Sequence, residues 1–164
     1  MSDLQETAAR QDRLTTSMNV DRANRTGEEQ LTLRSQISDL AMVPPWIEHL
    51  ASHYGISEET QYAMNLCLEE VLSNIIRHGY SNNPDCRIIV RYQSSQDKSS
   101  LLVVDDEAPL FNPLAADEMP VEDTLSGTRI GGLGIRLLRS FATRLEYEPT
   151  PAGNRLSMGF PAAR

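Results

Sequence analysis

The sequence predicts an α+β domain, a two-layer sandwich in which a mixed sheet carries its helices on one face. Short segments with the alternation or apolar character of strands are interspersed with longer segments of helical periodicity. Two pairs of these strand segments are separated by short polar turns, which predicts hairpins beside helices. A chain of 164 residues is long enough for one domain with its own core.

The composition limits the class of protein. The formal net charge is −8, and general binding of nucleic acid is not expected, because phosphates are held by clustered lysine and arginine. No apolar run approaches the ~20 residues of a membrane span, and the first residues lack the apolar stretch of a secretory signal. We therefore expect a cytoplasmic protein with no membrane partner. Cys67 and Cys86 lack zinc-ligand spacing, and Cys67 is expected to be a small buried apolar residue.

The chain divides into a polar N-terminal segment and one domain. Residues 1–28 have few large apolar side chains, which predicts a flexible N-terminal tail. Residues 29–164 are expected to form the domain. A strand is expected at 30–35, followed by helices at 37–54 and 57–78 and by strands at 86–92 and 100–105. A loop at 107–132, a helix at 133–142 and strands at 144–148 and 155–160 complete the domain.

Capping and turn residues mark the ends of the first two helices. Pro44 and Pro45 should either kink the first helical pattern or start a new helix there, and Gly55 should end it. Ser57 is suited to cap the second helix, and two glutamates follow in its first turn, where the macrodipole favours negative charge. Gly79 should end this second helix.

A carboxylate and an amide occupy the edge of the second helix. Glu70 and Asn74 are four residues apart, so they lie one turn apart on one face, beside the apolar stripe. Asn74 offers a neutral oxygen to Mg²⁺, and Glu70 can act as a general base on a hydroxyl or water near a γ-phosphate. The alternative is an ordinary amphipathic helix with a glutamate at its border. His78 could likewise serve only the helix dipole.

Acidic residues follow the second strand of the central hairpin. Asp105, Asp106 and Glu107 come directly after the buried run that ends at Val104. A carboxylate just past a buried strand is well placed to accept a hydrogen bond from a ligand, such as the exocyclic amine of adenine. The alternative is an Asx-type turn, which is common for Asp before Pro-rich sequence.

A glycine-rich segment, Thr128-Arg129-Ile130-Gly131-Gly132-Leu133-Gly134-Ile135, runs straight into the last long helix. Glycines let the backbone approach a ligand closely, and the free N–H groups of a helix N-terminus bind phosphate. Arg129 could add a charge-assisted hydrogen bond. The alternative is a flexible loop that ends at a helix, because the segment matches neither the P-loop nor the dinucleotide-binding pattern. An irregular stretch as long as 107–132 is usually functional or disordered.

Together and in this order, the three segments resemble the Bergerat ATP-binding fold of gyrase, histidine kinases, mismatch-repair ATPases and heat-shock chaperones. Glu70-x-x-x-Asn74 resembles the N box, Asp106-x-Ala108-x-x-Phe111 the first glycine box, and Gly132-Leu133-Gly134-Ile135 the second. From about residue 30 to its end, the chain is most similar to the anti-sigma-factor serine/threonine kinase family, whose N box has a similar His-Gly-Tyr ending. The stretch 113–131 falls where this family has its ATP lid.

The resemblance implies roles for individual residues. Glu70 is the implied catalytic proton acceptor, Asn74 the implied Mg²⁺ ligand, and Asp106 the implied adenine-binding carboxylate. The implied ATP-binding residues are Asn74, Arg77, His78, Asp106, Ala108, Phe111, Thr128, Arg129, Gly131, Gly132, Leu133, Gly134 and Ile135. ATP and Mg²⁺ are the expected cofactors. Ala108 replaces the usual glycine of its box, and because alanine restricts positive φ, we expect weaker ATP binding rather than none.

The resemblance also implies a function, that of an ATP-dependent protein serine/threonine kinase and anti-sigma factor. Its implied partner is a STAS-type anti-anti-sigma protein in a bacterial partner-switching module; a sigma factor can be a further partner, and the family commonly forms homodimers. The alternative is an ATP-sensing anti-sigma binding protein with little or no kinase activity. A histidine-kinase catalytic fragment is less consistent with the sequence, because the residues before Gln30 include no histidine and are too few for a dimerising helical pair.

Overall fold

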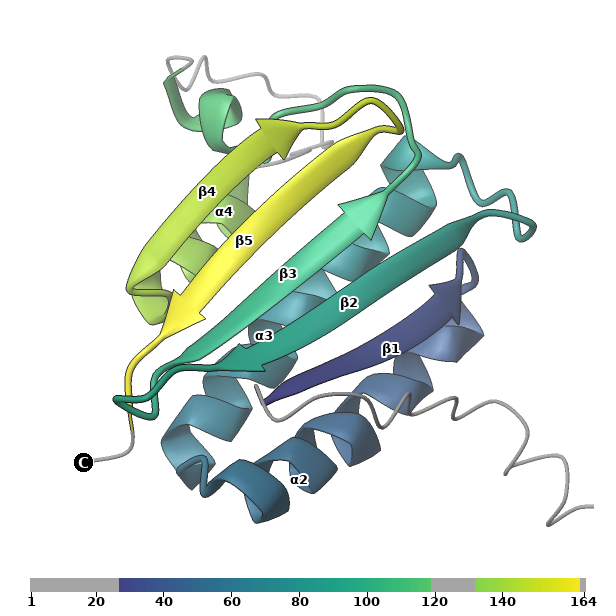
Figure 1. Cartoon of the computed structure of the whole chain (residues 1–164). Helices are drawn as coiled ribbons and strands as arrows, with labels where there is room; N and C mark the ends of the chain where they lie inside the picture. The colour runs from purple at the N-terminus through teal and green to yellow at the C-terminus, as the bar shows by residue number, and fades with distance from the viewer. Residues whose placement is uncertain (1–26, 119–131, 163–164) are drawn as a thin grey trace, which may run out of the picture.

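The fold is a five-stranded sheet with its helices packed on one face, as Figure 1 shows. The computed structural model describes residues 27–118 and 132–162. The strands are β1 (Glu28–Arg34), β2 (Arg87–Ser94), β3 (Ser100–Asp106), β4 (Arg144–Pro149) and β5 (Asn154–Phe160). The helices are η1 (Ile37–Met42), α2 (Val43–Tyr54), α3 (Glu58–Asn74), η2 (Ile75–Gly79), η3 (Pro113–Glu118) and α4 (Gly132–Phe141). The α+β class and the helices on one face are confirmed.

Every strand pairing in the described sheet is antiparallel, so the prediction of a mixed sheet is wrong. The strand order is β1-β2-β3-β5-β4. The helices η1, α2, α3 and η2 connect β1 to β2 and return the chain to the end of the sheet where β1 ended, so Arg34 pairs with Arg87. β5 lies between β3 and β4 and runs against both, because the helical connection from β3 leads to the sheet edge. The two predicted hairpins are confirmed as β2–β3 and β4–β5.

The two prolines begin a helix rather than kink one. The segment predicted as a single helix contains the 3-10 helix η1 followed by α2, with Pro44 and Pro45 in the first turn of α2. Proline is tolerated there because the first N–H groups of a helix have no intrahelical acceptor. At the other end, Gly55 adopts the left-handed conformation with φ of 70°, and its N–H donates to Ala51 O at 2.9 Å. The predicted helix end at this glycine is confirmed.

α3 begins at the predicted cap, and the chain stays helical to the predicted end at Gly79. Ser57 Oγ accepts a hydrogen bond from Thr60 N at 3.2 Å, which satisfies a free donor of the first turn. The predicted helical extent to about His78, ending at Gly79, is confirmed, but the last turn from Ile75 is the π-helix η2 rather than a continuation of the α-helix. Tyr80 N accordingly donates to Ile75 O, five residues earlier, at 2.9 Å. Such π-turns occur frequently at functional sites.

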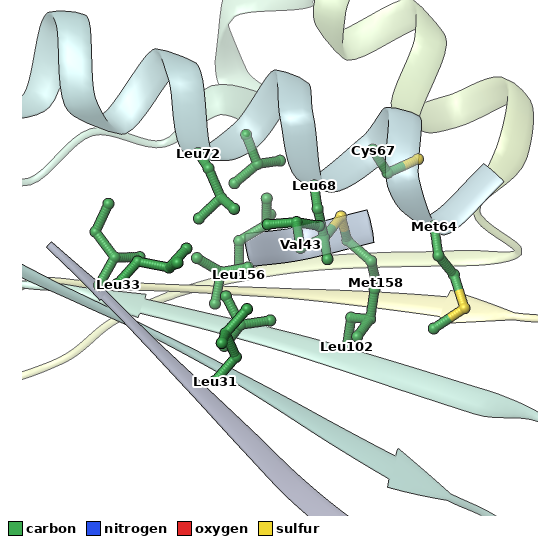
Figure 2. Close-up of a cluster of buried hydrophobic side chains, with 14 of the residues drawn as sticks. Leu31, Leu33, Val43, Met64, Cys67, Leu68, Leu72, Leu102, Leu156 and Met158 are labelled. Atoms are coloured by element: carbon green, nitrogen blue, oxygen red, sulfur yellow. The ribbon is translucent and has the colours of Figure 1, made fainter. Parts of the chain in front are cut away.

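The core lies between the inner face of the sheet and the helices (Figure 2). Along the strands, buried apolar side chains alternate with more exposed ones, as expected for a sheet covered on one face. Fully buried side chains include Trp46, Ile47, Leu50, Met64, Leu68, Leu72, Ile88, Leu102 and Phe160. Cys67 is part of this core, and burial raises the pKa of its thiol to about 12. This confirms the prediction that Cys67 is a small buried apolar residue.

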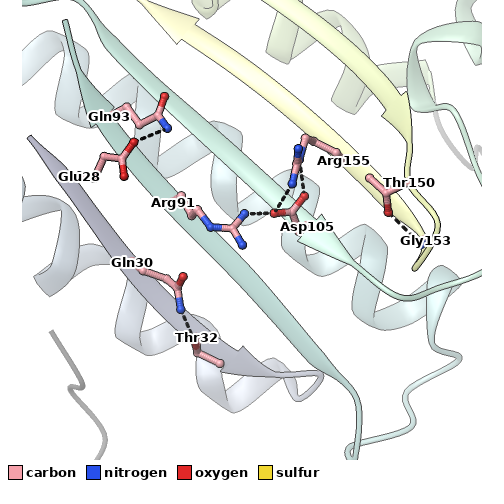
Figure 3. A network of polar contacts seen from close by, with 9 residues as sticks. All are labelled: Glu28, Gln30, Thr32, Arg91, Gln93, Asp105, Thr150, Gly153 and Arg155. Atoms are coloured by element: carbon pink, nitrogen blue, oxygen red, sulfur yellow. Dashed lines mark hydrogen bonds and ion pairs between the residues drawn. The ribbon is translucent and has the colours of Figure 1, made fainter. Parts of the chain in front are cut away.

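The opposite face of the sheet carries polar side chains (Figure 3). Asp105 accepts hydrogen bonds from Arg91 on β2 and from Arg155 on β5, with 2.6 Å between Arg155 Nε and Asp105 Oδ1. Because consecutive residues of a strand point to opposite faces, Asp106 points toward the helical layer instead. The alternation therefore gives the two neighbouring aspartates different surroundings.

Some predictions fall at the limits of the described residues. The predicted N-terminal tail lies outside them up to residue 26, and β1 begins at Glu28, one residue before the predicted start of the domain. Part of the predicted loop forms the short helix η3, where Asn112 Oδ1 accepts a hydrogen bond from Leu114 N at 2.9 Å. Within residues 27–118 and 132–162, no helix is both long and apolar enough to cross a membrane.

Candidate functional site

A cavity of about 400 Å³ opens between the helical layer and one end of the sheet. Its walls come from α3, η2, the segment after β3, α4, β4 and β5. The predicted binding residues that line it are Asn74, His78, Asp106, Ala108, Phe111, Gly134 and Ile135. Small-molecule sites typically have volumes of ~300–1,000 Å³, so the cavity can hold a ligand. Segments that are far apart in the sequence thus meet around one space.

Asn74 lines this cavity, and Glu70 lies one helical turn before it without being among the lining residues. Asn74 Nδ2 donates to Glu70 Oε1 at 2.7 Å, across one turn of α3. This bond uses the amide nitrogen and leaves Asn74 Oδ1 able to accept a hydrogen bond or to coordinate a cation. Glu70 also lies directly against α4, because a methyl group on Gly134 would overlap its carboxylate and come within 2.7 Å of its Cγ.

The first turn of α4 forms the glycine-rich side of the cavity. The helix begins at Gly132, and Gly134 and Ile135 are buried. The first N–H groups of a helix have no intrahelical acceptor and attract anions, so this turn is suited to phosphate. The predicted site residues that lie outside the described part of the chain are Thr128, Arg129 and Gly131, together with the side chain of Leu133.

Asp106 lies at the end of β3 in the cavity wall and is only 7% exposed. Its Oδ1 accepts two hydrogen bonds of 2.9 Å, from Asn154 Nδ2 and from Ala108 N. The second hydrogen bond forms an Asx turn, which confirms the alternative interpretation of the acidic segment, whereas the adenine-binding role of Asp106 stays a prediction. Burial raises the pKa of this carboxyl, and the two donors oppose the shift because they stabilise its charged form. Among the described residues nothing donates to Oδ2, which leaves that oxygen for a ligand.

Asn154 is a central residue of the site that sequence analysis did not name among the binding residues. It begins β5 and is 7% exposed. Its Nδ2 donates to Asp106 Oδ1 at 2.9 Å, to Ala108 O at 3.2 Å and to Pro109 O at 3.3 Å. Its Oδ1 accepts hydrogen bonds from Phe111 N and from Tyr147 Oη, both at 2.9 Å. One amide thereby joins β3, the segment after it, β4 and β5. The only sequence signal for this position is the turn at 149–154 that precedes it.

Tyr80 connects the end of η2 to the segment after β3. Its hydroxyl donates to Arg87 O at 3.1 Å and accepts from Glu107 N at 2.6 Å. Burial raises the pKa of this hydroxyl to about 12, so it remains a donor at neutral pH. The tyrosine of the His-Gly-Tyr segment therefore supports the wall of the cavity without lining it.

Ala108 fits its position without backbone strain. It is 5% exposed, and it is not among the described non-glycine residues with positive φ, which are Ser81, Asn82 and Lys98. The expectation of weaker ATP binding rested partly on a need for positive φ, and the structure does not support that reason. The side chain instead packs against η2, since a methyl group on Gly79 would come within 2.9 Å of Ala108 Cβ.

His78, Arg77 and Phe111 are exposed predicted binding residues, and only two of them line the cavity. His78 on η2 lines the cavity, whereas Arg77 is exposed and is not among the lining residues. Phe111 is 63% exposed at the mouth of the cavity, where its N–H is held by Asn154. The structure therefore brings His78 and Phe111 to the cavity and does not bring Arg77 to it.

The fold and a family match define the class of protein. Residues 33–160 match the family model of the histidine kinase-like ATPase domain. The matched segment includes α3, β3, α4 and β5, which contribute the walls of the cavity. The chain therefore belongs to the family of histidine kinase-like ATPase domains, and the predicted Bergerat-type fold is confirmed.

Individual relatives agree with this assignment. The chain is similar to the serine/threonine-protein kinase BtrW of Bordetella bronchiseptica, with 28% identity over 113 residues that cover 69% of this chain and 79% of the relative. It is similar to a crystal structure of the RsbU and RsbW domains of a Mycobacterium tuberculosis protein, with a TM-score of 0.61, 14% identity, and coverage of 85% of this chain but 33% of that one. It is also similar to a blue-light activated histidine kinase of Erythrobacter litoralis, with a TM-score of 0.50, 16% identity, and coverage of 76% and 41%. The two structures support the fold alone.

Proposed function

We propose that the chain is an ATP-dependent protein serine/threonine kinase that phosphorylates a STAS-type anti-anti-sigma partner. The observation that carries this proposal is that Asn74, which is hydrogen-bonded to Glu70, lines one cavity together with the first turn of α4 and the buried Asp106. The similarity to a serine/threonine-protein kinase supports the same activity. We propose a sigma factor and a second copy of the chain as further partners, and the cytoplasm as the compartment.

The residues around the cavity fit an adenine nucleotide with Mg²⁺. Asp106 Oδ2 can accept a hydrogen bond from the exocyclic amine of adenine, and the first turn of α4 suits the phosphates. Asn74 Oδ1 suits Mg²⁺, which in proteins takes few side-chain ligands and completes its shell with phosphate oxygens and water. Within the described residues no three His, Cys, Asp or Glu side chains gather as a metal site, so Asn74 would hold the ion together with phosphate. Bound Mg²⁺ would neutralise charge on the phosphates.

Glu70 is the proposed general base. Its Oε1 accepts from Asn74, and its Oε2 has no hydrogen-bond donor among the described residues. The carboxylate can therefore take the hydroxyl proton of a serine or threonine of the partner while the hydroxyl oxygen bonds to the γ-phosphorus of ATP and the bond from that phosphorus to the bridging oxygen breaks, which releases ADP. A base positioned in this way typically contributes about 10²–10⁴-fold to the rate.

The test is a phosphotransfer assay with γ-labelled ATP and the partner recovered by pull-down from native extract with ATP or ADP. We expect wild type to label a serine or threonine, and Glu70→Gln to reduce the rate by about 100-fold or more while ATP affinity is retained. Glu69→Gln is the matched control, because this neighbouring glutamate is exposed. Equal rates for Glu70→Gln and Glu69→Gln would contradict the assigned base. If wild type binds ATP but transfers no label to the partner, the chain is an ATP-sensing anti-sigma binding protein and not a kinase.

A further inference from the structure

The amide of Asn154 can adopt only one orientation in this site. Phe111 N is a backbone donor, so the amide atom that it contacts at 2.9 Å must be the oxygen. The amide nitrogen consequently faces Asp106 Oδ1 and the carbonyl of Ala108, both of which are acceptors. This orientation directs the available donors to Oδ1 of Asp106 and leaves Oδ2 without one among the described residues.

Tyr147 on the edge strand β4 holds this orientation from the other side. Its hydroxyl donates to Asn154 Oδ1 at 2.9 Å, and its side chain lines the cavity. The Gly153 N–H donates to Thr150 Oγ1 at 3.0 Å, so the turn that delivers Asn154 into β5 is also fixed (Figure 3). Asn154 is thus held from both the strand side and the turn side.

We propose that Asn154, oriented by Tyr147, is a positioning residue that makes Asp106 select adenine over guanine. The inference rests on the proposed ATP-binding function and adds the residues that determine base specificity. Adenine presents an exocyclic amine, a donor, at the position where guanine presents a carbonyl oxygen, an acceptor. An ionised carboxylate can only accept hydrogen bonds, so it attracts the first base and repels the second.

Asn154 acts by keeping Asp106 in its accepting form. Burial raises the pKa of the Asp106 carboxyl, and the hydrogen bond from Asn154 is the largest influence in the opposite direction. Without the amide, the protonated carboxyl becomes more favourable, and its O–H can donate to the guanine oxygen. Loss of Asn154 should therefore weaken ATP binding and reduce discrimination against GTP together.

The test compares nucleotides that differ only in the group facing Asp106. Isothermal titration calorimetry measures the Kd of Mg-ATP, Mg-GTP and the Mg complex of purine riboside triphosphate, which lacks the exocyclic amine. For Asn154→Leu we expect ATP affinity to fall about tenfold or more, affinity for the amine-free nucleotide to change far less, and the ATP-to-GTP preference to shrink. Tyr147→Phe keeps the ring and removes only the hydroxyl. It should lower the ATP affinity and the ATP-to-GTP preference by a smaller factor than Asn154→Leu does.

The outcomes separate this inference from the proposed function. An equal loss of affinity for ATP and for the amine-free nucleotide would mean that Asn154 only supports the fold, and would overturn the inference while ATP binding stands. Wild type that binds no adenine nucleotide would overturn both. Thermal unfolding of each variant checks folding, and if Asn154→Leu does not fold, Tyr147→Phe decides: unchanged base preference in that variant overturns the inference.

Discussion

Substitution of Gly134 by alanine separates the stability of the fold from the position of the proposed base. A methyl group at residue 134 would overlap the Glu70 carboxylate and lie 2.7 Å from Glu70 Cγ. The overlapping atoms belong to the end of a flexible, half-buried side chain, so Glu70 can rotate away without a backbone movement. Rotation would break the 2.7 Å hydrogen bond from Asn74 Nδ2 and take the carboxylate out of its place beside α4.

The two energetic consequences for stability nearly cancel. Alanine is favoured over glycine inside a helix by about 1 kcal/mol, and loss of a largely exposed hydrogen bond costs about 0.5–1.5 kcal/mol. The free energy of unfolding should therefore change by less than about 1 kcal/mol, which corresponds to a Tm shift of roughly 2–4 °C or less in a domain of this size. The phosphotransfer rate should fall by about 100-fold, because the base is displaced.

Thermal unfolding and the phosphotransfer assay, performed on the same preparation of Gly134→Ala, measure the two effects. Glu70→Gln is the reference variant, since it removes the base without any steric overlap. The phosphotransfer rate should fall by a similar factor in both variants. Gly134→Ala with the wild-type rate would show that the contact between α4 and Glu70 does not position the base. A Tm lowered by 10 °C would show that the clash is resolved by the backbone, contrary to the reasoning.

Three further predictions concern stability. Gly153→Ala should lower the free energy of unfolding by about 2 kcal/mol or more in chemical denaturation, because its methyl group would lie 2.7 Å from Glu107 Cα, and this backbone cannot rotate away. Gly55→Ala should cost about 1 kcal/mol through its positive φ alone, with calorimetric ATP affinity unchanged, because nothing lies near its added methyl group. Because the native pKa of Asp106 is raised, the wild-type free energy of unfolding falls as the pH rises from the unfolded pKa to the native pKa. Asp106→Asn should therefore have a higher free energy of unfolding than wild type at neutral pH, and this difference, measured by urea denaturation, should vanish as the pH falls toward ~4. An advantage independent of pH would contradict this assignment.

Much of the fold follows from local signals in the sequence. The helix ends depend on backbone requirements that single residues meet, as at Gly55 and Ser57, and such residues are visible without tertiary information. The hairpins follow from strand segments separated by short polar turns. The parallel or antiparallel direction of the sheet depends on which strands become neighbours, and the position of β5 between β3 and β4 has no local signal.

The candidate site was predictable to the extent that its residues form local motifs. Glu70 and Asn74 are one helical turn apart, so their contact follows from helix geometry. The contact between Asn154 and Asp106 joins residues 48 positions apart, and it exists only because β3 and β5 pair in register at these two residues. The close approach of Gly79 to Ala108 is another contact between distant segments, from η2 and the segment after β3, that no local motif indicates.

The surroundings of Asp106 illustrate how a binding site can depart from what stability alone would favour. A carboxylate that is only 7% exposed is stabilised by the donors it receives, yet the described protein groups donate to only one of its oxygens. A residue selected only for stability at this position would be neutral or fully hydrogen-bonded. Because the remaining oxygen belongs to a residue that lines the cavity, a donor from a bound ligand can supply the missing hydrogen bond. Burial raises the pKa of this carboxyl, and the oxygen without a protein donor makes the site selective for a ligand that carries one.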